Sequence, residues 1–188
     1  MATQPTPDKL SFTEYLRLER AADTKSEYRG GLLFAMAGGT LTHARLSARV
    51  ISLLERTAGR SCQVLTSDLK IYAAAVDEGM YPDASLLCAE PEFFDGRKDV
   101  LLNPTVVFEV LSPSTREYDQ SLKASFYRTI PSLEAIFLID SEQIYVQRQI
   151  RQGNGWLLEE RKNLDDALSL YGDARLTLRE IYDGIFRP

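Results

Sequence analysis

Apolar positions along the chain recur at two spacings, one typical of helices and one typical of strands. Steps of three and four residues predict amphipathic helices over residues 12–22, 42–58 and 116–129. The pair Ser11 and Glu14 forms a capping-box pattern at the start of the first helix. The third helix follows a Ser/Pro/Thr turn in which Ser114 or Thr115 can act as the cap.

Short runs rich in β-branched and aromatic residues predict strands. These runs cover residues 32–37, 61–72, 80–88, 105–111, 133–139 and 144–149, with shorter pieces at 156–158 and 175–178. We expect 61–72 and 80–88 to pair antiparallel, and 133–139 and 144–149 to form a hairpin. The segments 105–111, 116–129 and 133–139 suit a strand–helix–strand crossover. The expected fold class is α/β, with a central mixed sheet of about six or more strands flanked by helices.

One predicted strand contains a single charge. Within residues 105–111 only Glu109 is ionisable, and burying a carboxylate without a partner costs several kcal/mol. This side chain should therefore meet a cation or a metal. On the following helix Asp119, Lys123 and Tyr127 recur every four residues and share one face. Lys123 can thus point back toward Glu109.

A second carboxylate opens another apolar strand. Asp83 follows Pro82, and proline is confined to the first position or the edge of a strand. The residues between this strand and the one with Glu109 have turn composition, so the two strands can lie side by side. Two carboxylates at the ends of neighbouring strands predict a site for a hard divalent cation.

These residues, in this order, resemble a known family. The series consists of Tyr81-Pro82-Asp83, Asn103-Pro104, Glu109-Val110-Leu111-Ser112-Pro113-Ser114-Thr115, Asp119, Lys123, Tyr127 and Pro131-Ser132-Leu133. It is similar to the large bacterial family of Uma-type endonucleases, which belongs to the PD-(D/E)XK, or restriction-endonuclease-like, superfamily. The similarity extends from about residue 12 to residue 145.

The chain departs from the superfamily pattern at one position. The pattern places a lysine two residues after the second acid, where this chain has Leu111. The resemblance implies that Lys123 on the following helix takes over the role. Asp68 and Lys70 form another acid-x-lysine element on a strand-like run, but they precede the Pro-Asp pair. We therefore expect these two residues to be accessory.

The resemblance implies metal-dependent hydrolysis of DNA phosphodiester bonds. Asp83 and Glu109 would hold one or two Mg²⁺ or Mn²⁺ ions, and Lys123 would orient the attacking water or stabilise the transition state. Glu27 is either a third acid of the metal site, like its counterpart in the family, or a solvated turn residue. Further accessory roles fall to His43, Asp119 and Tyr127.

The helix over residues 42–58 carries its polar residues on two faces. His43 lies on the apolar stripe, where it is either a hydrogen-bonded core histidine or, as the resemblance implies, a site residue. Arg45, Arg49, Arg56 and Arg60 gather on another face. This basic stripe could follow a DNA backbone, cover a dimer partner or simply be solvated.

Composition narrows the class of protein. A length of 188 residues with 44% hydrophobic and 26% charged residues suits one globular domain over residues 1–188. No signal-peptide core or membrane-length apolar run occurs, so we expect a cytoplasmic location, without a membrane or an organic cofactor as partner. The net charge of −5 requires any DNA-binding surface to be local. Cys62 and Cys88 lack metal-ligand spacing and are expected to be reduced core thiols.

A second function stays open at this point. The charges of Asp83, Glu109 and Lys123 could form a buried ion-pair network in a non-catalytic DNA-binding or homo-oligomeric protein that keeps a nuclease fold. In the nuclease interpretation we expect a homodimer, because the chain is too small to hold a duplex alone and two-fold symmetry matches the two strands of DNA.

Overall fold

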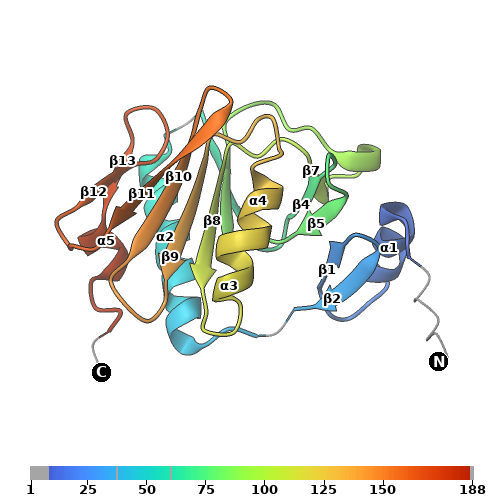
Figure 1. Cartoon of the computed structure of the whole chain (residues 1–188), viewed down its shortest axis with the longest axis horizontal. Helices are drawn as coiled ribbons and strands as arrows, with labels where there is room; N and C mark the ends of the chain where they lie inside the picture. The colour runs from blue at the N-terminus through green and yellow to red at the C-terminus, as the bar shows by residue number, and fades with distance from the viewer. Residues whose placement is uncertain (1–8, 37, 60, 187–188) are drawn as a thin grey trace, which may run out of the picture.

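The computed structural model describes residues 9–36, 38–59 and 61–186, and its larger sheet forms the centre of the molecule (Figure 1). The strand order is β11–β10–β9–β8–β6–β3. The strands are β3 (Gln63–Thr66), β6 (Ala84–Leu87), β8 (Val106–Leu111), β9 (Ala135–Asp140), β10 (Val146–Gln152) and β11 (Gly155–Arg161). β8 and β9 run parallel, and the other neighbours run antiparallel. The expected mixed sheet and α/β class are confirmed.

One face of this sheet packs against α2 (Leu41–Thr57) and α5 (Leu178–Tyr182), with the hairpin of β12 (Ala167–Ser169) and β13 (Arg175–Thr177) beside them. Because side chains alternate along a strand, Phe108 and Val110 of β8 point into this core. The rings of Phe108 and Phe137 stack there with centroids 4.8 Å apart.

The other face is covered by one helix in three parts. These are α3 (Arg116–Tyr118), the π-helical turn η2 (Asp119–Lys123) and α4 (Ala124–Tyr127). Val107 and Leu111 of β8 pack on this side together with Tyr127. Glu109 lies two residues from each of them along the strand, so its side chain points to the same face. It therefore faces the helix and not the core against α2.

A smaller sheet lies beside the same face, in the order β2–β1–β5–β4–β7. Its strands are β1 (Ser26–Arg29), β2 (Leu32–Ala35), β4 (Lys70–Ala73), β5 (Glu78–Met80) and β7 (Val100–Leu101). Helix α1 (Phe12–Glu19) packs on it through Phe12, whose ring stacks on Tyr72 at 3.7 Å. A short 3-10 turn, η1 (Phe94–Gly96), adds a further aromatic contact. None of the helices within the described ranges is long and apolar enough to cross a membrane.

Several local predictions hold and several need correction. The capping box of Ser11 and Glu14, the β9–β10 hairpin and the strand–helix–strand crossover are present. The first helix ends at Glu19, before the predicted residue 22, and β1 was not predicted at all. The predicted strands 61–72 and 80–88 are each split between the two sheets. A turn at residues 67–69 interrupts the first, and Pro82 interrupts the second. Their outer halves, β3 and β6, do pair antiparallel.

The prediction of reduced thiols is wrong, because a disulfide joins Cys62 to Cys88. Cys62 directly precedes β3, and Cys88 directly follows β6. The register sets Gln63 opposite Leu87, so the two cysteines form the next cross-strand pair, with Cα atoms 4.1 Å apart. Opposed residues of an antiparallel pair come close enough for a disulfide. The sequence spacing alone did not reveal this register.

Candidate active site

Asp83 and Glu109 lie opposite each other on neighbouring strands. β6 and β8 pair antiparallel with Ala84 opposite Phe108, and the next pair in this register is Asp83 with Glu109. Opposed residues point to the same side of a sheet, and both carboxylates line one cleft. The Val110 N–H also donates to Asp83 Oδ2 at 2.8 Å. The two acids therefore line the same cleft from neighbouring strands.

Lys123 is the buried positive charge at the centre of this cluster. Its Nζ lies 2.9 Å from Glu109 Oε1 and 3.0 Å from Glu27 Oε1, and it donates to the Tyr81 carbonyl oxygen at 3.1 Å. Burial alone would lower the pKa of Lys123, but the carboxylates around it, Glu109 first, raise that pKa well above its usual value. The lysine stays charged, and it reaches Glu109 as the helix spacing predicts.

The environment of Glu109 is almost dry. The residue is 3% exposed, and the Tyr127 hydroxyl donates to its Oε1 at 2.7 Å. Burial raises the pKa of Glu109 well above its usual value, although Lys123 opposes the shift. Burial also raises the pKa of Asp119, whose Oδ1 lies 4.0 Å from Lys123 Nζ. Oε1 of Glu109 thus has two partners, whereas its Oε2 has none among the described residues.

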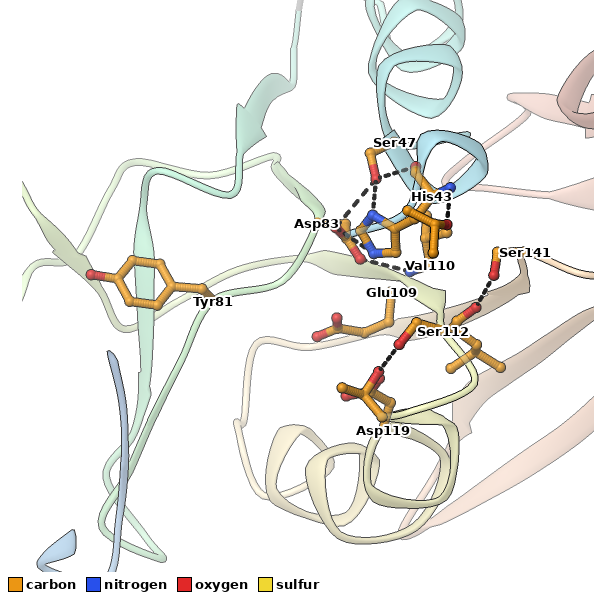
Figure 2. Close-up of polar contacts among 12 residues, drawn as sticks. His43, Ser47, Tyr81, Asp83, Glu109, Val110, Ser112, Asp119 and Ser141 are labelled. Atoms are coloured by element: carbon orange, nitrogen blue, oxygen red, sulfur yellow. Dashed lines mark hydrogen bonds and ion pairs between the residues drawn. The ribbon is translucent and has the colours of Figure 1, made fainter. Parts of the chain in front are cut away.

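Helix α2 holds Asp83 from the other side, as Figure 2 shows. His43 Nε2 lies 3.3 Å from Asp83 Oδ1, and the Ser47 hydroxyl donates to the same oxygen at 3.2 Å. The hydrogen bond to Asp83 raises the pKa of His43. Burial would raise the pKa of Asp83, but His43, the Val110 N–H and Lys123 together hold that pKa below its usual value. His43 is therefore a residue of this cluster and not of the apolar core.

Glu27 enters the cluster from the smaller sheet. It lies on β1 and is 4% exposed, so the solvated-turn alternative is wrong. Its Oε2 accepts a hydrogen bond from Arg29 Nη2 at 2.9 Å, while its Oε1 faces Lys123. Burial would raise the pKa of Glu27, but Lys123 and Arg29 hold it below the usual value. Charges therefore alternate along Arg29, Glu27, Lys123 and Glu109, from one sheet to the other.

The cleft containing these groups has a volume of about 510 Å³. Its walls come from β1, β2, the start of α2, the end of β8 and the turn that leads into α3. This volume is in the range of pockets that bind small molecules or parts of larger ones. Ionisable groups, an open wall and shifted pKa values together indicate a functional site.

A comparison with protein families places this geometry in context. The family model Uma2, described as "Putative restriction endonuclease", matches residues 12–178. The chain belongs to the Uma2 family. Two relatives from Synechocystis sp. (strain ATCC 27184 / PCC 6803 / Kazusa) are named uncharacterized proteins. The first, sll1609, is 35% identical, and the match covers 80% of this chain and 86% of the relative. The second, slr1290, is 34% identical, and the match covers 80% of this chain and 79% of the relative.

A solved structure supports the fold assignment. It is described as a putative nuclease belonging to DUF820 from Anabaena variabilis ATCC 29413 and matches with a TM-score of 0.77. The match covers 94% of this chain and 99% of that chain at 16% sequence identity. The restriction-endonuclease-like fold expected from the sequence is therefore confirmed for this Uma2 protein.

Restriction-endonuclease-like proteins generally use divalent metals. The carboxylates of Asp83 and Glu109 provide oxygen atoms of the kind that bind such an ion. Asp83 uses three of its roughly four lone-pair directions, and Glu109 Oε2 accepts no hydrogen bond from a described residue. Within the described ranges no three His, Cys, Asp or Glu side chains form a ready-made metal cage. Mg²⁺ is usually bound by one or two carboxylates together with water and substrate phosphates, so two acids suffice.

Other predicted residues of the Uma2 chain lie elsewhere. Asp68 sits in the turn before β4, and not on a strand face with Lys70, and its exposed side chain pairs with Lys25. Lys70 pairs with Glu19 at 2.9 Å and lies over the ring of Tyr15. Neither Asp68 nor Lys70 belongs to the cleft wall, so their accessory role stays a prediction.

The predicted basic stripe packs partly against the C-terminal segment. Arg45 donates to the carbonyl oxygens of Gly184 and Ile185 at 2.8 and 3.1 Å, and Arg49 donates to that of Glu180 at 3.0 Å. Both arginines thus bind the chain's own backbone, although Arg45 is exposed and Arg49 is half-buried. Arg56 is exposed, and Arg60 lies outside the described residues. A role in DNA binding or dimerisation stays untested.

Sequence reasoning missed four contributors to the site. Ser47 lies four residues after His43 on α2, a spacing that places both on one helix face. Arg29 lies two residues after Glu27, a spacing that places both on one strand face once β1 is recognised. Tyr118 packs on Arg29, and Tyr81 contributes its backbone carbonyl while its ring points away from the acids (Figure 2).

Proposed function

We propose that this protein is a divalent-metal-dependent endodeoxyribonuclease whose centre consists of Asp83, Glu109 and Lys123. The observation that carries the proposal is the 2.9 Å contact between Lys123 Nζ and Glu109 Oε1, next to Asp83 in an open cleft. In this proposal Lys123 of η2 takes the role that the superfamily pattern gives to a lysine at position 111. Membership of the Uma2 family supports the same reaction class.

Each group at the centre has a distinct task in this proposal. Asp83 and Glu109 would hold Mg²⁺ or Mn²⁺, which when bound would supply an acidified water molecule and positive charge to offset that of the phosphate. His43 and Ser47 keep the Asp83 carboxylate ionised and oriented. Tyr127 fixes Glu109 Oε1, which leaves Oε2 for the ion.

Lys123 provides a fixed positive charge beside the reacting phosphate. Glu27 and the Tyr81 carbonyl hold its ammonium group, so the charge needs no reorganisation during the reaction. We assign Glu27 to this anchoring role. Both of its oxygens already face cations, Lys123 and Arg29, which makes Glu27 a poorer metal ligand than Asp83 or Glu109.

A cleavage assay on supercoiled plasmid DNA, with a labelled RNA in parallel, tests the proposal. The wild-type protein should cleave the DNA in Mg²⁺ or Mn²⁺ and not in EDTA. Asp83→Asn, Glu109→Gln and Lys123→Met should each lose at least about a hundredfold in rate, as expected for removal of a metal ligand or a fixed charge. Arg17→Met, an exposed change on α1 away from the cleft wall, is the matched control. Absence of metal-dependent cleavage by the wild-type protein refutes the proposal.

A second candidate is a non-catalytic binding protein in which the same charges only stabilise the fold. The full burial of Lys123 among protein oxygens favours this alternative, since a structural ion pair has the same geometry. Metal binding distinguishes the two. A site that binds Mn²⁺ raises the melting temperature by mass action, whereas a closed ion-pair network does not.

We also propose that the protein acts as a homodimer paired through β2. This strand is an edge of the smaller sheet, and Leu32, Leu33 and Phe34 are 39–41% exposed on it. Edge strands of monomers are usually protected by charges or proline, and β2 has neither. A two-fold axis would pair β2 antiparallel with its copy without opposing charges. Phe34 also lines the cleft, so this interface would adjoin the site.

A further inference from the structure

Arg29 is the permanently charged cation exposed on the cleft wall. Among the described residues that line the cleft, the basic ones are Arg29, His43 and Lys123. Lys123 is buried and occupied by protein oxygens, and His43 engages Asp83. The Arg29 side chain, in contrast, is 27% exposed. A phosphate that enters this acidic cleft needs a fixed positive charge to offset the carboxylates.

The guanidinium group of Arg29 lies over two aromatic rings. Its Cζ lies 3.6 Å from the ring centroid of Tyr118 and 4.3 Å from that of Phe34. Two aromatic contacts therefore restrain the position of the guanidinium group. Its Nη2 donates to Glu27.

The remaining nitrogens of Arg29 differ in access. Nε is buried without a partner. Nη1 has no hydrogen-bond partner among the described residues, and the Arg29 side chain lines the cleft. A planar guanidinium that packs on two rings, is partly exposed and has a nitrogen not engaged by a described residue suits a phosphate oxygen.

We infer that Arg29 binds a phosphodiester group of the nucleic-acid strand in the cleft, adjacent to the phosphate that is attacked. The inference rests on the proposed function, which supplies the nucleic acid as ligand. Arg45 and Arg49 are weaker candidates for this contact, because their guanidinium groups already bind backbone carbonyls of the C-terminal segment. A lysine at position 29 would keep the charge but could not form the flat stack on Tyr118 and Phe34.

DNA binding without metal tests this inference independently of cleavage. A short fluorescent DNA duplex is titrated in EDTA between about 50 and 200 mM NaCl, and the affinity is read from anisotropy. Arg29→Met should weaken binding at least about tenfold, as expected for the loss of a charged hydrogen bond. It should also reduce the slope of log affinity against log salt by about 0.9, the value for one phosphate contact.

Two further variants sharpen the result. Arg29→Lys should keep the salt slope of the wild-type protein and recover only part of the affinity, because charge is retained and the fixed plane is lost. Arg17→Met removes an exposed arginine of α1 outside the cleft wall and should bind like the wild type. Thermal unfolding shows whether each variant is folded. If Arg29→Met fails to fold, Arg29→Lys decides the question.

The outcomes separate this inference from the nuclease proposal. The inference is overturned if Arg29→Met keeps the affinity and salt slope of the wild type, or if Arg29→Lys keeps its affinity. It is also overturned if Arg17→Met loses as much affinity as Arg29→Met, or if the wild-type protein does not bind DNA. If the protein binds DNA through Arg29 but no metal supports cleavage, the inference stands and the nuclease proposal fails. Cleavage by a wild-type protein whose Arg29→Met variant binds normally overturns the inference alone.

Discussion

Replacing Lys123 with methionine should cost a large part of the stability of the fold. The change removes the ammonium group from Glu109 Oε1, Glu27 Oε1 and the Tyr81 carbonyl and leaves two carboxylates that are 3% and 4% exposed. Removing one partner of a buried ion pair costs about 3–5 kcal/mol. An exposed pair is worth only about 0.2–1 kcal/mol. Since a domain is stable by about 5–15 kcal/mol, the variant should fold but be clearly weakened.

The loss should depend on pH. Burial already raises the pKa of Glu109, and Lys123 is the main group that opposes the shift. Without the lysine this pKa rises further. A carboxyl group whose pKa is raised on folding contributes stability that is fully present below its unfolded pKa, about 4.3, and lost as pH rises through the folded value. Lys123 is also the main group that holds the pKa of Glu27 below its usual value, so in the variant ionised Glu27 becomes destabilising as pH rises above its unfolded pKa of about 4.3. The deficit of Lys123→Met relative to wild type should therefore be larger at pH 8 than at about pH 5.

Urea denaturation followed by the fluorescence of Trp156, the single tryptophan, measures both effects. Arg17→Met serves as the control for loss of an exposed charge. The double variant Lys123→Met/Glu109→Gln should recover part of the lost stability, because an amide is cheaper to bury than an unpaired carboxylate. A loss below about 1 kcal/mol at pH 8, or an equal loss at both pH values, would refute the assignment of Lys123 as the buried counterion.

Three further predictions concern the acids and the edge strand. His43 is the only histidine, so an NMR titration can follow its imidazole protons without overlap. Asp83→Asn should lower the pKa of His43, and an unchanged pKa would show that Asp83 is not its partner. Mn²⁺ should raise the melting temperature of the wild-type protein but not of Asp83→Asn or Glu109→Gln, and an equal rise in all three would place the ion elsewhere. Leu33→Lys on β2 should convert a dimer to a monomer in sedimentation, and a wild-type monomer at tens of micromolar would exclude the dimer.

The chemistry of the centre was largely predictable because it follows local periodicity. Glu109 is the only charge in an apolar strand, and the spacing of Lys123 and Tyr127 places both on the helix face that packs over it. Asp83 could be placed because Pro82 marks the start of β6. In each case the residues that define the element lie within a few positions of the functional side chain.

The remainder depends on contacts between distant segments. The sequence indicated a turn around Glu27, and β1 becomes recognisable as a strand only through its pairing with β2 and β5. Arg45 and Arg49 both face the C-terminal segment from α2, but no local pattern indicates that this segment supplies carbonyls to them. Likewise, the disulfide depends on the pairing of β3 with β6, and no local pattern around Cys62 or Cys88 specifies the register of that pair.

The alternating charges give the smaller sheet a direct part in the site. Glu27 lies on β1 of the smaller sheet, Glu109 lies on β8 of the larger sheet, and Lys123 bridges them with contacts of 3.0 and 2.9 Å. If the two sheets separated, Lys123 would lose Glu27 and the Tyr81 carbonyl, and Arg29 would leave Tyr118. A ligand that binds only the assembled cleft must therefore stabilise the docked arrangement of the two sheets. By linkage, the docked arrangement strengthens binding of that ligand by the same free energy. The β1–β2 hairpin thus contributes to the site as well as to the fold.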